Sequence, residues 1–353
     1  MNYDALLVLS FGGPEHPDDV LPFLRNVTRG RGVPDERLAV VAEQYALFGG
    51  RSPINDQCRQ LIAALETELA EHDLDLPIYW GNRNWHPMLT DTVQQMTADG
   101  VRRALVFVTS AFGSYSGCRQ YREDLASAIE GLDNAPTLEK LRLFYNHPGF
   151  LVPAADRVAT ALAAHPVDTS APDDRGKHRL IFTAHSIPNS MAAVCDYESQ
   201  LREAAGLIVE LLPGTAPAWD LVYQSRSGPP QVPWLEPDVG DHLEALSEDG
   251  IEQVTVVPLG FVSDHMEVLY DLDTQAAARA SELGIGLTRA ATVGTDPAFV
   301  SMIRELVEER LHDRPRLFLG SSGAWPDQCP EGHCIAATGG RPRGATAPVQ
   351  RPE

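Results

Sequence analysis

The chain has 353 residues, with 49 acidic and 28 basic side chains, and a formal net charge of −21 at pH 7. This length exceeds one ordinary hydrophobic core and predicts two lobes, while the acidic balance argues against nucleic acid or an anionic membrane surface as a partner. The first residues, MNYDALLVLSFGG, lack the basic start of a secretion signal, and no apolar stretch is long enough to span a bilayer. We therefore expect a cytoplasmic protein without a transmembrane segment, and take it to be a monomer.

Strand and helix patterns alternate along the first half of the chain. Short apolar runs predict strands at residues 5–9, 77–81, 104–109 and 138–144. Helical patterns lie between them at residues 18–27, 35–48, 51–72, 90–100 and 118–131. This alternation builds a parallel sheet with helices on both faces. Residues 1–148 are predicted to form an N-terminal Rossmann-like lobe.

The second half repeats the alternation. Strands are predicted at residues 179–182, 219–224, 253–257 and 286–290, and helices at residues 150–165, 197–211, 241–248, 267–283 and 298–312. The fold class is thus α/β, with two Rossmann-like lobes facing each other across a cleft. Residues 149–312 form the C-terminal lobe, and residues 313–353 form a tail. The end of the tail, residues 336–353, has almost no large apolar residue and is predicted to be disordered.

The stretch KHRLIFTAHSIPN brings an imidazole to the end of a predicted strand. The apolar run at residues 180–182 is typical of a buried strand, and Pro188 prevents that strand from continuing. Because ligands of open α/β sheets bind beyond the carboxyl ends of the strands, His185 is a candidate functional residue. The alternative is a hydrogen-bonded histidine that only caps a strand.

A second polar stretch, PLGFVSDHMEVLYDLD, follows another predicted strand. Helical spacing places Glu267 and Asp271 on one face, with Asp264 before them and Asp273 beside them. Like charges at this spacing repel unless a cation binds; the alternative is a solvated acidic face. The apolar residues around them favour a buried helix. Imidazole and carboxylate groups suit divalent first-row metals, so His185 with Glu267 is a predicted metal or proton-transfer pair.

The N-terminal half offers groups for an anion. Arg29 and Arg31 lie in a basic loop that contains glycine, and Ser52 lies at the start of a predicted helix. Both features suit an anionic ligand. Together with the pair of His185 and Glu267, these groups predict a bulky anionic ligand that meets a divalent cation and loses protons.

These motifs resemble the ferrochelatase family, whose members insert ferrous iron into a porphyrin. FTAHSIP, GFVSDHMEVLYDLD, LVLSFGGPE, GGRSPIN, SYSGCRQYRED and QSRSGPPQVPWLEPDV are similar to family segments in the same order, over about residues 4–312. GNRNW and QSRSGPPQVPWLEPDV most resemble the actinobacterial branch. That resemblance implies coproporphyrin III as the substrate and coproheme as the product, in heme biosynthesis. The implied enzyme is a lyase-class metal chelatase.

The resemblance implies roles for the pair of His185 and Glu267. His185 and Glu267 match the family's site pair, which takes the pyrrole protons and guides the substrate iron, Fe²⁺, to the porphyrin centre. A neutral imidazole beside a carboxylate is a suitable base for a porphyrin that must lose two N–H protons. Asp271 is expected to relay protons or iron to solvent.

Other residues are implied to contact the porphyrin. Arg29, Arg31 and Ser52 are placed to hold its propionates. Phe11 stands where some bacterial relatives carry a tyrosine on the open side of the metal, and a phenyl ring cannot ligate iron. Tyr115, at another strand end, is the expected substitute as axial ligand; the alternative is a hydrogen-bonded loop tyrosine.

The cysteines are Cys58, Cys118, Cys195, Cys329 and Cys334. An odd number in a cytoplasmic chain argues against a disulfide framework. Many ferrochelatases hold a 2Fe–2S cluster with three tail cysteines and one from the body, but this tail offers only Cys329 and Cys334. The resemblance implies a structural cluster with Cys195 as the body ligand and Cys118 as the fourth. The alternatives are His333 as a ligand, a zinc-binding tail, or a tail that binds nothing.

Three alternatives to this function stay open. Protoporphyrin IX could replace coproporphyrin III as the substrate. A related chelatase could insert cobalt or nickel into a corrin-type ring, although such relatives tend to be shorter and to use paired histidines. A non-enzymatic tetrapyrrole carrier is disfavoured by the acidic residues and by the lack of a secretion signal.

Overall fold

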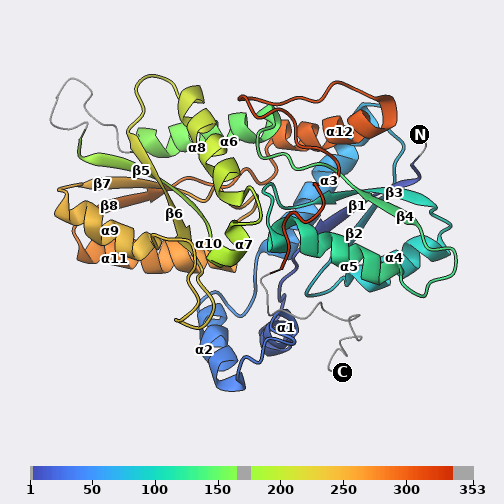
Figure 1. Ribbon diagram of the computed structural model, residues 1–353, viewed down its shortest axis with the longest axis horizontal. Helices are drawn as coiled ribbons and strands as arrows, with labels where there is room; N and C mark the ends of the chain where they lie inside the picture. Colours follow the sequence, from blue (N-terminus) through green and yellow to red (C-terminus); the bar gives the residue numbers. More distant parts are fainter. Residues whose placement is uncertain (1–2, 165–175, 337–353) are drawn as a thin grey trace.

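Two parallel sheets form the centres of two α/β lobes (Figure 1), in a computed structural model that describes residues 3–164 and 176–336. The first sheet has the order β2-β1-β3-β4, with strands β1 (Ala5–Ser10), β2 (Ile78–Asn82), β3 (Arg103–Val108) and β4 (Thr137–Lys140). The second has the order β6-β5-β7-β8, with strands β5 (His178–His185), β6 (Ala218–Gln224), β7 (Gln253–Val257) and β8 (Gly286–Arg289). The described strands pair in parallel throughout. The predicted fold class is confirmed.

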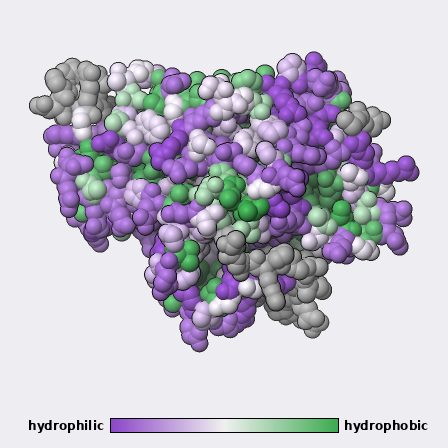
Figure 2. Space-filling view, viewed as in Figure 1, coloured by the Kyte–Doolittle hydropathy of each residue, from purple (hydrophilic) through white to green (hydrophobic). Residues whose placement is uncertain are grey.

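Helices connect the strands and cover the sheets. In the first lobe they are η1 (Pro17–Asp19), α1 (Val20–Val27), α2 (Asp35–Ala46), α3 (Ile54–Glu71), α4 (Leu89–Ala98), the π-helical segment η2 (Tyr115–Arg119) and α5 (Gln120–Ile129). After them come α6 (Pro148–Ala164), α7 (Asn189–Ala192), α8 (Tyr197–Leu211), α9 (Val239–Glu248), α10 (Met266–Tyr270), the π-helical segment η3 (Asp271–Ala276), α11 (Ala277–Glu282) and α12 (Pro297–His312). Within the described ranges, no helix is long and apolar enough to cross a membrane. Hydrophilic residues predominate on the face shown in Figure 2.

The strands are apolar on both faces because helices cover both sides of each sheet. All six residues of β1 are buried, and so are the interior positions of β5. In each sheet the chain starts on an inner strand, moves to one neighbour, and then crosses to the other side. The strand order therefore reverses between β1 and β3 and between β5 and β7, and ligands of such folds bind beyond these strand ends.

Several local predictions differ from the structure; strand β4, predicted at residues 138–144, ends at Lys140. Strand β5 continues through His185, three residues beyond the predicted end, because residues 183–185 still pair with β6. The predicted helices at residues 118–131 and 267–283 contain π-helical turns, η2 and η3, which side-chain periodicity does not reveal. Helix α7 has only four residues, too few to show a helical period.

The last helix returns to the first lobe. Helix α12 follows the second sheet in sequence, but it packs against both α3 and α6 (Figure 1). Its Phe299 meets Phe107 of β3 and Phe144 at edge-to-face geometry, with ring centroids 6.4 and 5.9 Å apart. The lobe boundary at residues 148 and 149 stays a prediction, and one core joins the two lobes.

The tail continues this crossing without helix or strand up to residue 336. The Arg142 guanidinium, fully buried, donates two 2.8 Å hydrogen bonds to the Glu309 carboxylate of α12 and one to the carbonyl of Leu317. The N–H of Leu319 donates to the carbonyl of Asn146. Residues 337–353, most of the stretch predicted to be disordered, lie outside the described residues.

Candidate active site

His185 ends β5 with one ring nitrogen anchored and the other free. Its Nδ1 lies against the carbonyl oxygen of Ser186, which can only accept, so Nδ1 carries the proton and donates it. In the neutral ring, Nε2 then has the free lone pair. The Tyr197 hydroxyl donates to the His185 carbonyl at 3.0 Å and holds the strand end in place. The side chain is 33% exposed, so solvent and ligands reach it.

Glu267 stands beside this imidazole from the first turn of α10, the helix that follows β7. Its Oε1 lies 3.8 Å from His185 Nε2, and its side chain is 47% exposed. The backbone fixes its position: the Glu267 N–H donates to Nδ1 of His265, the N-cap of α10, and its carbonyl accepts from Gln224 Nε2 at 3.0 Å. Burial lowers the pKa of His265, which favours the neutral ring that this cap requires. The carboxylate itself is left for chemistry.

Asp271 lies one helical turn further on, at the start of η3. Its Oδ2 accepts hydrogen bonds from the Ser225 hydroxyl and from Gln224 Nε2. Burial, helped by the charge of Glu267, raises the pKa of Asp271 to about 6. A carboxyl group with this pKa can take and release a proton near neutral pH. π-helical turns are frequent at functional sites, and here the turn begins at this residue.

The predicted acidic face divides into two parts. The Arg289 guanidinium at the end of β8 bonds to Asp264 at 3.0 Å and to Asp273 at 2.5 Å. These two carboxylates therefore share one cation, which the sequence did not indicate because Arg289 is distant in the chain. Among the described residues, Glu267 and Asp271 have no Lys or Arg partner.

The residues predicted to hold the anion lie in the first lobe. Arg29 and Arg31 are exposed in the turn after α1. Arg31 is accessible to solvent yet closely surrounded by protein, and this burial, with the charge of Arg83, lowers its pKa. Ser52 is only 4% exposed and lies under the turn after β1, where its N–H donates to the Pro14 carbonyl. Their contacts with a ligand stay predictions.

Tyr115 begins η2 and is half-buried. Its hydroxyl donates to Glu123 Oε2 at 3.0 Å, and burial together with this carboxylate raises its pKa. In this arrangement it is a hydrogen-bonded tyrosine, and iron ligation, which stays a prediction, requires that bond to break. Phe11, at the end of β1, is 37% exposed and packs edge-on against Phe23.

Sequence reasoning missed Arg83, whose side chain contacts the backbone of η2. Arg83 is buried at the end of β2, pairs with Asp124 at 2.7 Å, and lies over the Tyr121 ring at 4.5 Å. Its Nη1 also donates to the carbonyl of Ser116 within η2. A lone arginine directly after a predicted strand was the available signal.

The four cysteines of the predicted set lie as two neighbouring pairs, and their binding of a cluster stays a prediction. Cys118 lies beside Cys329, and Cys334 lies beside Cys195, whose thiol donates to the carbonyl of Met191 at 3.2 Å. This proximity raises the pKa of Cys118 and Cys334 and lowers that of their partners. Cys334 also experiences the charges of the other three sulfurs. Cys58 lies apart in the core, where burial raises its thiol pKa to about 11.

The tail reaches both lobes to make this arrangement. The N–H of Cys334 donates to the carbonyl of Val194 in the second lobe, and Arg119 of η2 donates to the carbonyl of His333. The His333 ring itself faces Asp196 at 3.1 Å. The thiols are thus gathered where η2, the start of α8 and the tail meet.

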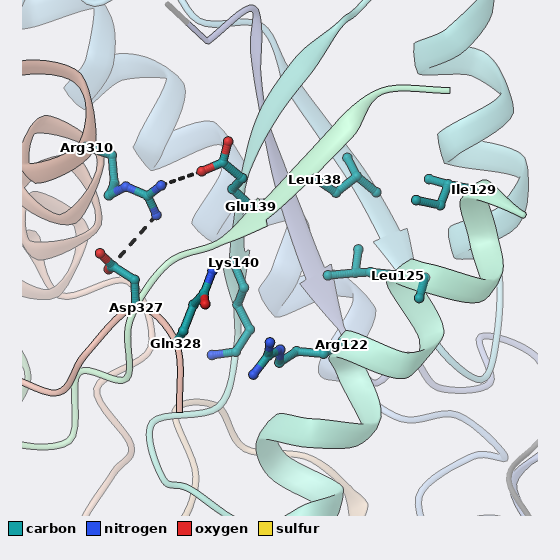
Figure 3. Close-up of a pocket in the computed structure, with 10 residues that line it drawn as sticks. Arg122, Leu125, Ile129, Leu138, Glu139, Lys140, Arg310, Asp327 and Gln328 are labelled. Atoms are coloured by element: carbon teal, nitrogen blue, oxygen red, sulfur yellow. Dashed lines mark hydrogen bonds and ion pairs between the residues drawn. The ribbon is translucent and has the colours of Figure 1, made fainter. Parts of the chain in front are cut away.

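A hollow of about 260 Å³ lies between α5, β4 and the tail (Figure 3). Arg310 bridges Glu139 and Asp327 there and ties the tail to β4. The charges of Arg122 and Lys140, on the same wall, act to lower the thiol pKa of the nearby cysteines. A cationic wall favours thiolates, the form that binds iron. Among the described residues, including these cysteines, no group of three His, Cys, Asp or Glu side chains forms a site for a single metal ion.

Comparisons with known proteins identify the fold first. The chain resembles SirB from Bacillus subtilis, solved with Fe³⁺, at a TM-score of 0.52 and 12% identity, covering 88% of this chain and 98% of that one. The two-lobed architecture is therefore that of the chelatases. The chain matches the ferrochelatase family profile over residues 3–311. It belongs to the ferrochelatase family, whose members are metal chelatases of the lyase class.

Sequence relatives agree over nearly the whole chain. A coproporphyrin III ferrochelatase from Frankia alni is 57% identical, over 98% of this chain and 90% of the relative. One from Streptomyces griseus is 51% identical over 99% and 97%. A protein from Rhodopirellula baltica, named ferrochelatase, is also 51% identical, over 99% and 98%. The predicted family is confirmed.

Proposed function

We propose that the protein inserts ferrous iron into coproporphyrin III. The observation that carries the proposal is the His185–Glu267 pair, with Nε2 and Oε1 3.8 Å apart at the strand order reversal of the second sheet. The choice of porphyrin is supported by the names of the relatives from Frankia and Streptomyces. The product would be coproheme, an intermediate of heme biosynthesis.

Each site residue has its own part in proton transfer. The free lone pair of His185 Nε2 takes a pyrrole proton, and the Glu267 carboxylate stabilises the resulting imidazolium. Glu267 also offers oxygen ligands to the incoming substrate iron. Asp271, with a pKa of about 6, accepts protons from this pair and releases them to solvent. Ser225 and Gln224 hold its carboxyl group in place.

The first lobe holds the porphyrin in this proposal. Arg29 and Arg31 are exposed cations that suit propionate groups. Ser52 would need the turn around Pro14 to move before its hydroxyl could contribute, since that hydroxyl is buried. Tyr115 would become an axial ligand only after releasing Glu123.

One assay tests the function. Purified protein is mixed anaerobically with ferrous iron and coproporphyrin III, and metallated product is followed by visible absorption. Turnover many times the enzyme concentration is expected, and faster than with protoporphyrin IX. A preference for protoporphyrin IX would contradict the substrate, and turnover only with cobalt or nickel would contradict the metal. Porphyrin binding without any turnover would favour a carrier.

We also propose that the protein carries a 2Fe–2S cluster bound by Cys118, Cys195, Cys329 and Cys334. The two neighbouring thiol pairs suit two irons with two thiolates each, and the cations of Arg122 and Lys140 suit an anionic group. When bound, such a cluster supplies covalent links from the tail to both lobes. Visible absorption with equal iron and sulfide is expected on analysis; protein free of both would reject the cluster.

The protein is further proposed to act as a cytoplasmic monomer, as its sequence suggests. Light scattering during size-exclusion chromatography measures the mass, and 38.5 kDa is expected. A mass of twice this value would contradict the monomer.

A further inference from the structure

Two glutamines occupy equivalent places in the two lobes. Gln57 is the fourth residue of α3, and Gln200 is the fourth residue of α8. Helix α3 precedes β2, the second strand of its sheet, and α8 precedes β6, the second strand of the other. Because both sheets have the same strand order, the two side chains are related by the repeat of the fold.

Gln57 crosses from the first lobe to the second. Its Nε2 donates to the carbonyl of Asp264 at 2.8 Å, and its Oε1 accepts from the N–H of the same residue, also at 2.8 Å. The amide group thus pairs with both backbone groups of Asp264, as a neighbouring strand would. Asp264 lies in the loop after β7, three residues before Glu267.

Gln200 makes the reciprocal crossing, from the second lobe to the first. Its Oε1 accepts from the N–H of Gly113 at 2.7 Å, and the side chain is buried. Gly113 lies in the loop after β3, two residues before Tyr115. The approach is close: a Cβ at Gly113 would lie 3.3 Å from Gln200 Oε1 and 3.0 Å from Leu143 Cδ1. Each glutamine therefore reaches the loop after the third strand of the other lobe.

The helices that carry these glutamines also hold residues at the strand ends of their own lobes. On α3, the Asn55 amide bonds to Gly13 and to the carbonyl of His86, both in loops at the strand ends of the first sheet. On α8, Tyr197 holds the carbonyl of His185. Each helix thus connects strand-end loops of its own lobe to one loop of the other.

We infer that Gln57 and Gln200 are positioning residues that set the register between the two lobes across the active site. Gln57 places the Glu267 loop against the first lobe, and Gln200 places the Tyr115 loop against the second. A substrate held by one lobe is then aligned with the proton-accepting pair of the other. The inference rests on the proposed iron insertion. Misplacement of reacting groups by about 1 Å can lower a rate about a hundredfold, so the rate depends strongly on how the two lobes are aligned.

The test compares Gln57→Met and Gln200→Met with Gln95→Met. Methionine keeps the length of the side chain and removes the amide, and Gln95 is an exposed residue of α4 whose amide donates to Asp99, the C-cap of the same helix. Hydrogen exchange is measured for peptides covering residues 259–267 and 110–116. We expect faster exchange of the first peptide in Gln57→Met, of the second in Gln200→Met, and of neither in Gln95→Met, because each loop loses its clamp.

The same variants are assayed for iron insertion. In Gln57→Met we expect kcat to fall about tenfold or more while the KM for the porphyrin changes less than about threefold, because the misplaced group is Glu267. In Gln200→Met we expect a raised porphyrin KM. Unchanged hydrogen exchange in both variants would show that the two glutamines do not hold these loops, whether or not the wild type has activity. Faster exchange with unaltered kcat and KM in an active enzyme would overturn the positioning role. An inactive wild type would instead refute the proposed function, and with it the positioning role.

Discussion

His185 Nε2 and Glu267 Oε1 lie 3.8 Å apart although they come from different strand ends, one closing β5 and the other following β7. Backbone contacts hold both residues: Ser186 and Tyr197 fix the histidine, and His265 and Gln224 fix the glutamate. The atoms that we propose to react, His185 Nε2 and the Glu267 carboxylate oxygens, take no part in these contacts. That separation of anchoring from chemistry is what a proton-accepting pair needs.

The first prediction concerns this pair. His185→Ala should lower kcat for iron insertion by about 10²–10⁴-fold, because general-base catalysis contributes that much. Porphyrin affinity, measured by fluorescence quenching, should stay within about threefold of wild type, since we place the propionate contacts in the other lobe. His242→Ala is a matched control, because this histidine pairs with Asp220 away from the site. Turnover retained in His185→Ala would contradict its role as the base.

Asp271 gives a pH-dependent stability. Its pKa is raised from 3.8 to about 6 in the fold, so the folded protein binds the proton more tightly than the unfolded chain. The contribution of Asp271 to the free energy of unfolding is therefore fully present below pH 4 and is lost as pH rises through about 6. One pKa unit corresponds to about 1.4 kcal/mol, so ionisation costs up to about 3 kcal/mol of unfolding free energy.

Asp271→Asn removes this titration. The difference in unfolding free energy between the variant and the wild type, from urea unfolding at pH 4, 5, 6 and 7, should shift in favour of the variant as pH rises. Ser225 and Gln224 can still donate to the asparagine oxygen. A difference that is constant across this pH range would show that the carboxyl group titrates normally.

The positions of the two main site residues were predictable from the sequence. The contacts that hold them in place were not. The apolar run before His185 and the acidic helix start at Glu267 both follow predicted strands, and parallel strands bring their carboxyl ends to one edge. Periodicity alone does not show that Arg289 pairs with Asp264, since this needs the pairing of β7 with β8. The amide of Gln57 is equally invisible, because an isolated glutamine has no pattern.

The cysteine set was predicted by resemblance, and its geometry required the structure. Nothing in the spacing of Cys118 and Cys195 relates them to the tail. Their approach depends on α12 crossing back to the first lobe and on Arg142 and Asn146 holding the chain that follows. Such long-range backbone contacts arise from packing and leave no local signal.

Arg142 gives a third prediction, on stability. Arg142→Met leaves the Glu309 carboxylate buried without its partner, and breaking a buried pair in this way costs about 3–5 kcal/mol. Urea unfolding measures the loss. Arg25→Met, which breaks an exposed pair with Asp35, should cost less than about 1 kcal/mol. The double variant Arg142→Met with Glu309→Leu should recover much of the loss, and failure to do so would show that the Leu317 contact dominates.

Tyr115 gives a fourth prediction, on spectroscopy. If its hydroxyl leaves Glu123 to ligate the product iron, Tyr115→Phe should change the visible spectrum of the iron–porphyrin complex. Glu123→Gln, which weakens the competing hydrogen bond, should change it in the opposite sense. An unaltered spectrum in Tyr115→Phe would leave Tyr115 as the hydrogen-bonded residue that the structure shows.

The last prediction concerns the tail. Cys329→Ser and Cys195→Ser should each abolish the iron and sulfide content, because a 2Fe–2S cluster needs four ligands. Cys58→Ser is the matched control, since this thiol lies in the core away from the set, and it should keep the cluster. Without the cluster, the tail keeps the packing of Trp325 against the core, with hydrogen bonds and ion pairs such as those of Arg119 and Arg310. Proteolysis near residue 334 should therefore quicken in the two variants before the lobes unfold. Equal protection in all three proteins would show that these weaker contacts suffice to hold the tail, and that a cluster is not what secures it.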